Sequence, residues 1–93
     1  MMEIKILDKT GSFAENKDVA RELRLKIMLV LKKENVTLDF DGVEGATQSF
    51  IHALISDIIR EYGSNILDKI YFKNCNEMIK KIISIVADYM QES

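Results

Sequence analysis

The sequence of 93 residues contains no proline and no tryptophan, and its only cysteine is Cys75. A single cysteine excludes a disulfide within the chain, and there is no apolar run of signal-peptide or transmembrane length. We therefore expect a cytoplasmic protein with no membrane contact. Internal repeats, low-complexity segments and linkers are also absent, so residues 1–93 are expected to form a single domain with one core.

The sequence also lacks an excess of basic residues. Its 15 Asp and Glu outnumber its 13 Lys and Arg, which gives a formal net charge of −2. Nucleic acids and anionic membranes both attract clustered Lys and Arg. The charge balance therefore argues against nucleic acid as a partner and favours a protein or a small molecule.

What the sequence does contain is an alternation of strand and helix patterns. Strands are predicted from alternating or β-favouring runs, and helices from apolar residues that recur with a period near 3.6. The order is β-α-β-α-β-α, with predicted bounds at 3–7, 17–33, 36–40, 50–62, 68–72 and 74–90. Helices between successive strands favour parallel pairing through crossovers, so we predict a small α/β domain of two or three layers. The first strand is placed at an edge of the sheet and the second in its centre.

Turn and cap residues separate these elements. Gly11 is expected to adopt a positive φ in the first loop, and residues 13–14 to fold that loop onto the core. Asn16 is a candidate cap for the first helix, in competition with a capping box that begins a turn earlier. Gly63 is expected to end the second helix, and Asn74 to start the third.

The third helix has a wider apolar stripe than one face of a sheet requires. Met78, Ile85 and Tyr89 extend the stripe that residues such as Ile79 and Val86 form. A broad face wrapped around a small core is one interpretation of this width. Cover by a partner or by a second copy of the chain is the other, so a homodimer is left open.

The closest resemblance to an enzyme lies in the run Asp-Phe-Asp-Gly-Val at residues 39–43. It is similar to the first motif of haloacid-dehalogenase-type phosphatases, in which the first aspartate is the nucleophile and the second is the acid. That chemistry requires Mg²⁺ held by further carboxylates and a basic residue that balances the phosphate. Nothing after Asp39 repeats the aspartate pair, so Asp39 and Asp41 are interpreted as strand-end and turn residues. We expect no catalytic residue, and an Mg²⁺-dependent phosphatase is the remote alternative.

His52 and Cys75 are the other conventional catalytic candidates. Neither has partners at the spacing of a metal site or a catalytic triad. Cys75 lies beside a predicted helix start, which is a position that can lower a thiol pKa, although a structural cysteine is the favoured interpretation. His52 is expected on the flank of the second helix. We predict no metal site and no cofactor.

Thr47, Gln48 and Ser49 stand at the start of the second predicted helix. One of the two hydroxyls is expected to cap this helix. A hydroxyl at a helix N-terminus is also a candidate phosphorylation site, because exposed backbone amides accommodate the added negative charge. Capping and phosphorylation are compatible, so the sequence leaves both roles open for Thr47 and Ser49.

An ordered set of segments spans nearly the whole chain: Gly11–Ala14 with Ala20 and Leu23, Leu38–Phe40 with Gly42 and Val43, Thr47–Phe50, and Phe72–Asn74. This set resembles the STAS-like domains of unknown function. That family is similar in turn to the sulfate-transporter and anti-sigma-factor-antagonist (STAS) domains. The resemblance implies a STAS-like sheet with helices packed against it, and a regulatory rather than catalytic role.

In anti-sigma-factor antagonists, a phosphorylatable serine lies at the start of the helix after the central strand, within an Asp-Ser-Ser/Thr-Gly pattern. A kinase with a histidine-kinase-like ATPase fold recognises that end of the domain. Alignment of the strand ends places Thr47, Gln48, Ser49 and Phe50 on these four positions. Asp is replaced by Thr, the usual phosphoserine by Gln and Gly by Phe, while Ser49 retains the second hydroxyl.

The resulting prediction is a non-catalytic regulatory protein-interaction module that docks a protein partner, for which a histidine-kinase-like ATPase is the candidate class. Docking is expected at the edge where the second strand leads into the second helix, with residues 47–50 as the main contacts. Asp41 and Glu44 are expected to supply negative charge beside them, and Phe50 is either an interface anchor or a core residue. Ser49 and Thr47 are the candidate phosphorylation sites. The alternative is a sensor of a small anion or nucleotide at the same helix start, although the two acids disfavour an anion and no Gly-rich phosphate loop is present.

Overall fold

The computed structural model describes residues 1–91 and contains two small parallel sheets and three long helices. The elements, in order, are β1 (Met2–Lys5), α1 (Leu7–Thr10), β2 (Phe13–Ala14), α2 (Lys17–Leu31), β3 (Val36–Asp39), β4 (Gly45–Ala46), α3 (Gln48–Tyr62), the 3₁₀ helix η1 (Ser64–Lys69), β5 (Ile70–Lys73) and α4 (Glu77–Gln91). The main sheet has the strand order β1-β3-β5, and β2 pairs with β4. The predicted α/β class is confirmed, with the first strand at an edge and the second in the centre.

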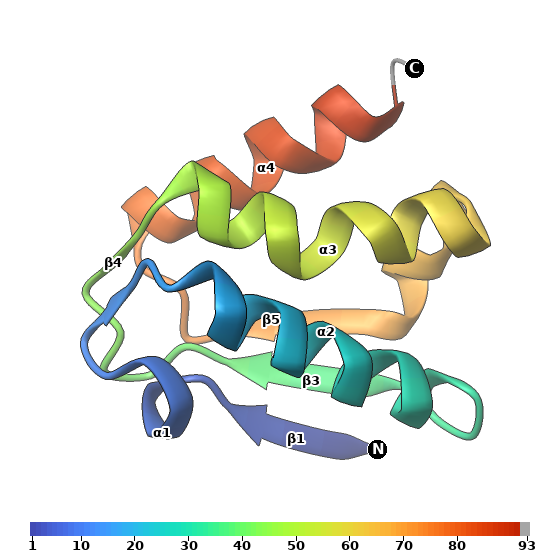
Figure 1. The fold of residues 1–93 in the computed structure, drawn as a ribbon, viewed down its shortest axis with the longest axis horizontal. Helices are drawn as coiled ribbons and strands as arrows, with labels where there is room; N and C mark the ends of the chain where they lie inside the picture. Colours follow the sequence, from blue (N-terminus) through green and yellow to red (C-terminus); the bar gives the residue numbers. More distant parts are fainter. Residues whose placement is uncertain (92–93) are drawn as a thin grey trace.

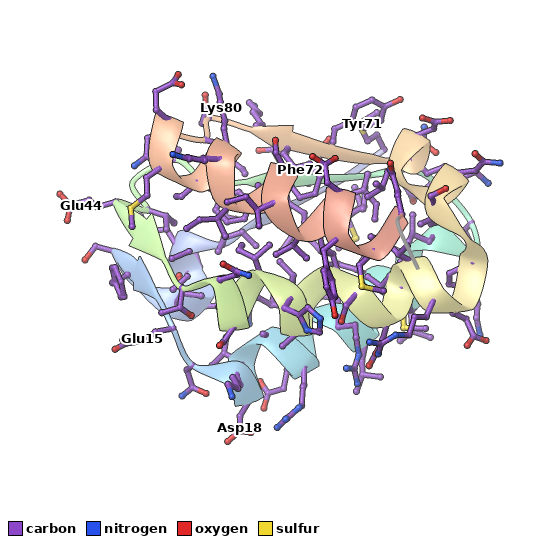
Figure 2. All side chains as sticks on the ribbon, turned by 90° about the horizontal axis from the view of Figure 1, so that it is seen from above. Glu15, Asp18, Glu44, Tyr71, Phe72 and Lys80 are labelled. Atoms are coloured by element: carbon purple, nitrogen blue, oxygen red, sulfur yellow. The ribbon has the colours of Figure 1, made fainter. Side chains whose placement is uncertain are left out.

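All three long helices lie on one face of the main sheet (Figure 1), and α3 lies between α2 and α4 (Figure 2). In β3, Val36 and Leu38 are fully buried, because they point toward the helix layer. Thr37 and Asp39 alternate with them on the opposite face, which is polar. There the Lys73 amine pairs with the Glu3 carboxylate at 3.3 Å. The domain therefore has two layers.

Helix α3 supplies much of the core because its apolar residues recur at helical spacing. Its buried apolar residues are Phe50, Ile51, Leu54, Ile55, Ile58 and Ile59. The helix ends as predicted at Gly63, whose φ is 83° and whose N–H donates to the Ile59 carbonyl at 2.7 Å. Gly11 also has the predicted positive φ, at 73°. Among residues 1–91, no helix combines the length and apolar character that a membrane span requires.

The predicted bounds of two strands are wrong at their ends. The first strand stops at Lys5, since Ile6 turns inward with its N–H on the Asp39 carbonyl at 2.9 Å and the chain enters α1. The third strand begins at Ile70 instead of residue 68. Ile70 is level with Val36, the first residue of the neighbouring strand, so an earlier residue has no partner in β3. The preceding residues form η1, which the sequence patterns did not predict, and the same holds for α1, β2 and β4.

The helix starts confirm one predicted cap and correct another. The Asn16 side chain accepts hydrogen bonds from the N–H groups of Asp18 and Val19, at 2.8 and 3.3 Å, and therefore caps α2. Asn74 does not start α4, because it adopts a φ of 58°. Asn76 caps α4 instead, with its Oδ1 accepting from the Ile79 N–H at 2.9 Å.

Two further details differ from the prediction. Helix α2 ends at Leu31, two residues before the predicted bound, as the N–H groups of Lys33 and Glu34 both turn back to the Val30 carbonyl. In the loop before α2, Ala14 is buried as predicted, whereas Phe13 leaves 45% of its surface exposed.

Candidate functional site

The strands of the main sheet end at the side of the molecule where α2, α3 and α4 begin (Figure 1). We call this region the rim, and define it as residues 11–17, 40–49 and 74–77. In open α/β domains, binding sites lie at the carboxyl ends of the strands, and helix N-termini contribute partial positive charge there. The predicted site residues therefore belong to the part of the fold where a site is expected.

Hydrogen bonds between distant segments hold the rim together. The Glu44 N–H donates to the Ser12 carbonyl at 2.7 Å, and the Thr47 N–H donates to the Ala14 carbonyl at 3.0 Å. The Asn76 Nδ2 group donates to the Glu44 carbonyl at 2.8 Å while its Oδ1 caps α4. The loop before α3 is thus fixed to the loop before α2 on one side and to the start of α4 on the other.

The start of α3 contains two residues with structural roles and two residues whose side chains are exposed. The Thr47 Oγ1 atom accepts from the Phe50 N–H at 3.0 Å, which confirms that a hydroxyl caps this helix. Phe50 is fully buried, so it is a core residue in this structure. Gln48 and Ser49 are exposed, and within residues 1–91 neither side chain makes a hydrogen bond.

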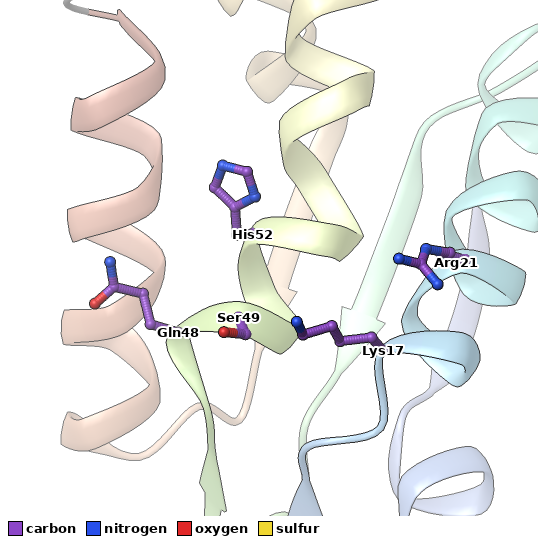
Figure 3. A pocket seen from close by; sticks show the side chains of 5 residues that line it. All are labelled: Lys17, Arg21, Gln48, Ser49 and His52. Atoms are coloured by element: carbon purple, nitrogen blue, oxygen red, sulfur yellow. The ribbon is translucent and has the colours of Figure 1, made fainter.

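A polar hollow of about 360 Å³ adjoins these two side chains, and it is lined by Lys17, Arg21, Gln48, Ser49 and His52 (Figure 3). Lys17 and Arg21 reach from α2 toward the start of α3, and Gln48 points toward α4. The Arg21 guanidinium pairs with Asp18 at 3.1 Å, in an exposed contact of low energetic value. Lys17 makes no ion pair among residues 1–91.

The two cations of this hollow were not among the predicted site residues, because they precede Ser49 by about thirty residues. The signal that was available is Asn16, which predicts a helix start at the same rim. The parallel topology then brings the first turns of α2 and α3 together.

The two predicted acids lie on the rim but not in this hollow. Asp41 lines a smaller hollow of about 140 Å³ with Lys5, Leu7, Asp8 and Asp39. Glu44 points outward at the end of the molecule (Figure 2). The side chains that border Ser49 are therefore basic or neutral, and the acidic part of the rim is separate from them.

Asp39 joins the ends of two strands. Its Oδ1 atom accepts hydrogen bonds from the Asn74 Nδ2 group at 3.0 Å and from the Asp41 N–H at 2.9 Å. The bond from Asn74, and to a lesser extent that from Asp41, lowers the pKa of the Asp39 carboxyl below its ordinary value of 3.8. The strand-end role assigned to Asp39 agrees with this geometry. Among residues 1–91, no group of three or more His, Cys, Asp or Glu is placed to hold a metal ion.

The other two candidates have structural surroundings. Burial raises the pKa of the Cys75 thiol, so the lowered value considered from its position near a helix start is wrong. The reason is that α4 begins only at Glu77, while Cys75 is half-buried before it. His52 lies on the flank of α3 as predicted, and its ring centroid is 6.5 Å from that of Tyr89 on α4.

The rim also contains an exposed apolar side chain, that of Phe13. Phe13 lies over Gly45, so closely that a Cβ atom on Gly45 would be 2.7 Å from the Phe13 Cε1 atom. The sequence predicted that Phe13 and Ala14 both fold this loop onto the core, and for Phe13 that prediction is wrong. The rim therefore combines an exposed aromatic ring with the polar first turn of α3.

Comparison with known families gives one match. Residues 19–80 match the family described as STAS-like domain of unknown function, over a segment that includes β3, α3 and β5. Searches among the curated proteins and among the solved structures found no match. The matched segment covers more than half of the chain and contains residues 47–50, on which the resemblance was chiefly based. The chain therefore belongs to the family of STAS-like domains of unknown function.

Proposed function

We propose that this chain is a non-catalytic regulatory module that docks a protein partner through the rim and the exposed side of α3. The observation that carries the proposal is the first turn of α3, where Gln48 and Ser49 are exposed while Thr47 and Phe50 fix the backbone beneath them. A histidine-kinase-like ATPase is the partner class, by analogy with the anti-sigma-factor antagonists that this family resembles. The partner class rests on this analogy, whereas the docking surface rests on the geometry of the site.

Two properties of the rim support recognition of a protein. Its loops are tied together by the bonds of Glu44, Thr47 and Asn76, so little conformational entropy is lost on docking. Its surface places the exposed ring of Phe13 near polar side chains, and protein interfaces are enriched in aromatic residues with a polar surround.

Ser49 is the hydroxyl that suits regulation by phosphorylation, and Thr47 is the less suitable one. The Thr47 Oγ1 atom already caps α3, and a phosphoryl group there would disturb the cap. Ser49 is exposed beside Lys17 and Arg21, whose charges favour a phosphoryl group. A phosphorylated Ser49 would offset the positive charge of Lys17 and Arg21 in the hollow and so change the docking of a partner.

The test of docking is a substitution that adds bulk and positive charge at the rim. The native chain is used as bait, its partner is identified and purified, and the dissociation constant is measured by calorimetry. Ser49→Arg is expected to weaken binding at least about 30-fold, the loss of roughly 2 kcal/mol that defines an interface hot spot. Ser64→Arg is the matched control, since Ser64 is exposed just beyond the opposite end of α3. Equal affinity of the Ser49→Arg and Ser64→Arg variants for the partner would show that the rim is not part of the interface.

The test of phosphorylation uses the purified partner and ATP. Mass spectrometry is expected to find a phosphoryl group on Ser49, and the Ser49→Ala variant is expected to lose it. Thr47→Ala should still be modified at Ser49. Modification of Thr47 alone contradicts this part of the proposal, and so does an active ATPase that modifies neither hydroxyl. Docking is tested separately, by the dissociation constants of the Ser49→Arg and Ser64→Arg variants.

A second candidate function is a sensor of a small anion or nucleotide, and the hollow with Lys17 and Arg21 at the start of α3 favours it. A ligand that binds the native state raises the melting temperature by mass action. Inorganic phosphate and ATP are the probes in a thermal-shift assay, and the double variant Lys17→Ala, Arg21→Ala is the control. A shift that the double variant loses supports the sensor, whereas no shift at millimolar ligand rejects it.

A further inference from the structure

Helix α4 carries an apolar stripe that the domain itself does not cover. One side of α4 is buried against the core through Ile79 and Val86. A neighbouring stripe consists of Met78, Ile82, Ile85 and Tyr89, of which Met78, Ile85 and Tyr89 are 50%, 43% and 64% exposed. Ile82, its fourth member, is half-buried because it also packs against the core. The wide apolar stripe predicted for this helix therefore consists of a core stripe and a surface stripe.

The surface stripe has the spacing of a coiled-coil seam. Successive members are four, three and four residues apart, which places Met78 and Ile85 at d positions and Ile82 and Tyr89 at a positions of a heptad. The e positions are then Ile79 and Val86, which face the core of their own domain. Only the g side of the seam is free to meet a partner.

The g positions are Lys81 and Asp88, and both are exposed. Within residues 1–91, neither makes an ion pair. In antiparallel coiled coils, the g side of one helix meets the g side of the other, whereas in parallel ones it meets the e side. A parallel partner would set both g sides against buried e sides, whereas an antiparallel partner leaves one flank on which the two exposed g sides meet. The antiparallel arrangement is therefore favoured, and it needs opposite charges at the two g positions.

The helix supplies those charges itself. We infer that this chain forms a two-fold symmetric homodimer in which two copies of α4 pack antiparallel along the surface stripe. The two-fold axis places Met78 opposite Tyr89 of the partner subunit and Ile82 opposite Ile85 of the partner subunit. It also places Lys81 beside Asp88 of the partner subunit, and does so twice, as an isologous interface requires.

The proposed dimer does not rest on docking at the rim, although its surface adjoins that region through Met78 and His52. His52 supports it from α3, because its ring lies beside that of Tyr89 and limits the positions open to the tyrosine. A second exposed apolar surface lies around Leu25, Leu29 and Tyr62. It serves as the control surface.

Charge reversal is the first test, with dissociation constants measured by analytical ultracentrifugation of the full chain. The native chain is expected to dimerise in the micromolar range. Lys81→Asp and Asp88→Lys are each expected to weaken self-association about tenfold, because two attractive contacts become repulsive. A mixture of the two variants is expected to form heterodimers of near-native affinity, since every g pair is then complementary. A mixture that associates no better than either variant alone overturns the antiparallel arrangement.

Disruption of the seam is the second test. Ile85→Lys is expected to raise the dimer dissociation constant at least about 30-fold. Leu29→Lys makes the same kind of change at a residue of α2 that is 65% exposed. It is expected to change the dimer dissociation constant by less than about threefold. Circular dichroism confirms that both variants are folded. A native chain that stays monomeric at millimolar concentration, or a dimer that Leu29→Lys breaks and Ile85→Lys spares, overturns the inference.

Discussion

The two ends of helix α3 are held in different ways. At its start, Thr47 caps the helix with its hydroxyl and donates its own N–H to Ala14, which belongs to another strand. At its end, Gly63 turns the chain with a bond to Ile59 of the same helix. The start of α3 is thus fixed by distant segments, while its end needs only a residue that can adopt a positive φ.

The surfaces beside the two ends differ in the same way. The start of α3 borders the polar hollow with Lys17 and Arg21. The end of α3 borders an apolar hollow of about 530 Å³ that Leu25, Leu29 and Tyr62 help to line. Side chains that recognise a partner must be held in fixed positions, and only the first end is built for that purpose. The following predictions test this contrast.

The largest expected effect comes from the aromatic residues near the two ends. Phe50 is fully buried and Tyr62 is 43% exposed, although both lie on α3. Phe50→Ala is expected to lower the free energy of unfolding by about 3–5 kcal/mol, through lost burial and a cavity. Tyr62→Ala is expected to cost under about 1 kcal/mol, as is usual for a surface change. Urea denaturation measures both, and comparable losses would mean that Phe50 is not a core residue.

Glycine substitutions distinguish the two ends by mechanism. Gly63 has a φ of 83° and a ψ of 166°, a conformation almost restricted to glycine, so Gly63→Ala is expected to cost about 1–3 kcal/mol through backbone strain. Near the start of α3, Gly45→Ala would instead force the ring of Phe13 to move. Because that ring is half-exposed and can move, Gly45→Ala is expected to lower the free energy of unfolding by about 1 kcal/mol, which is the lower end of the range for overpacked sites.

The control for the glycine pair is a second substitution. In the double variant Gly45→Ala, Phe13→Ala, the cost of the added methyl group should disappear, because the ring that it meets is gone. A Cβ atom added to Gly63 would meet no atom of residues 1–91 within 4 Å, so no partner change can relieve its strain. A Gly45→Ala cost that persists without Phe13 would contradict the assigned cause.

Removal of the cap of α3 is expected to lower the free energy of unfolding by about 1 kcal/mol. Thr47→Ala removes the acceptor for the Phe50 N–H and is expected to lower the free energy of unfolding by that amount, whereas Thr47→Ser keeps the acceptor. Ser49→Ala, two positions further along the chain, is expected to change stability by less than about 0.5 kcal/mol. Chemical denaturation of the three variants measures the contrast. A destabilising Ser49→Ala would mean that Ser49 has a structural partner.

The sequence was sufficient for the parts of this fold that depend on periodicity. The apolar spacing from Phe50 to Tyr62 predicted α3, and the β-favouring run at 36–40 predicted the central strand. The caps predicted at Asn16 and Gly63 were also correct, and at the first of them the competing capping box was not used. These features are local, so a short window of sequence contains their cause.

Features that depend on pairing between distant segments were not predictable. The strand near residue 68 was started too early because its limit is set by Val36 across the sheet. Asn74 was taken as a helix start, whereas its side chain is bound to Asp39. Lys17 entered the candidate site only through the meeting of α2 and α3. Each of these three errors involves a contact between segments that lie far apart in the sequence.

The smallest expected effect concerns pH and the link between Asp39 and Asn74 at the rim. Asn74 lowers the pKa of Asp39 below 3.8, so the folded state binds a proton less readily than the unfolded state. The link therefore stabilises the fold above pH 3.8, and its contribution is lost as the pH falls through the lower folded pKa. Asn74→Gly tolerates the φ of 58° and removes the main cause, so the Asp39 pKa should rise toward its ordinary value in an NMR titration. Asp39→Asn should flatten the acid limb of the stability curve. A pKa unchanged by Asn74→Gly would contradict the leading role of Asn74 and assign the lowered pKa to the Asp41 amide with Lys73 and Lys5.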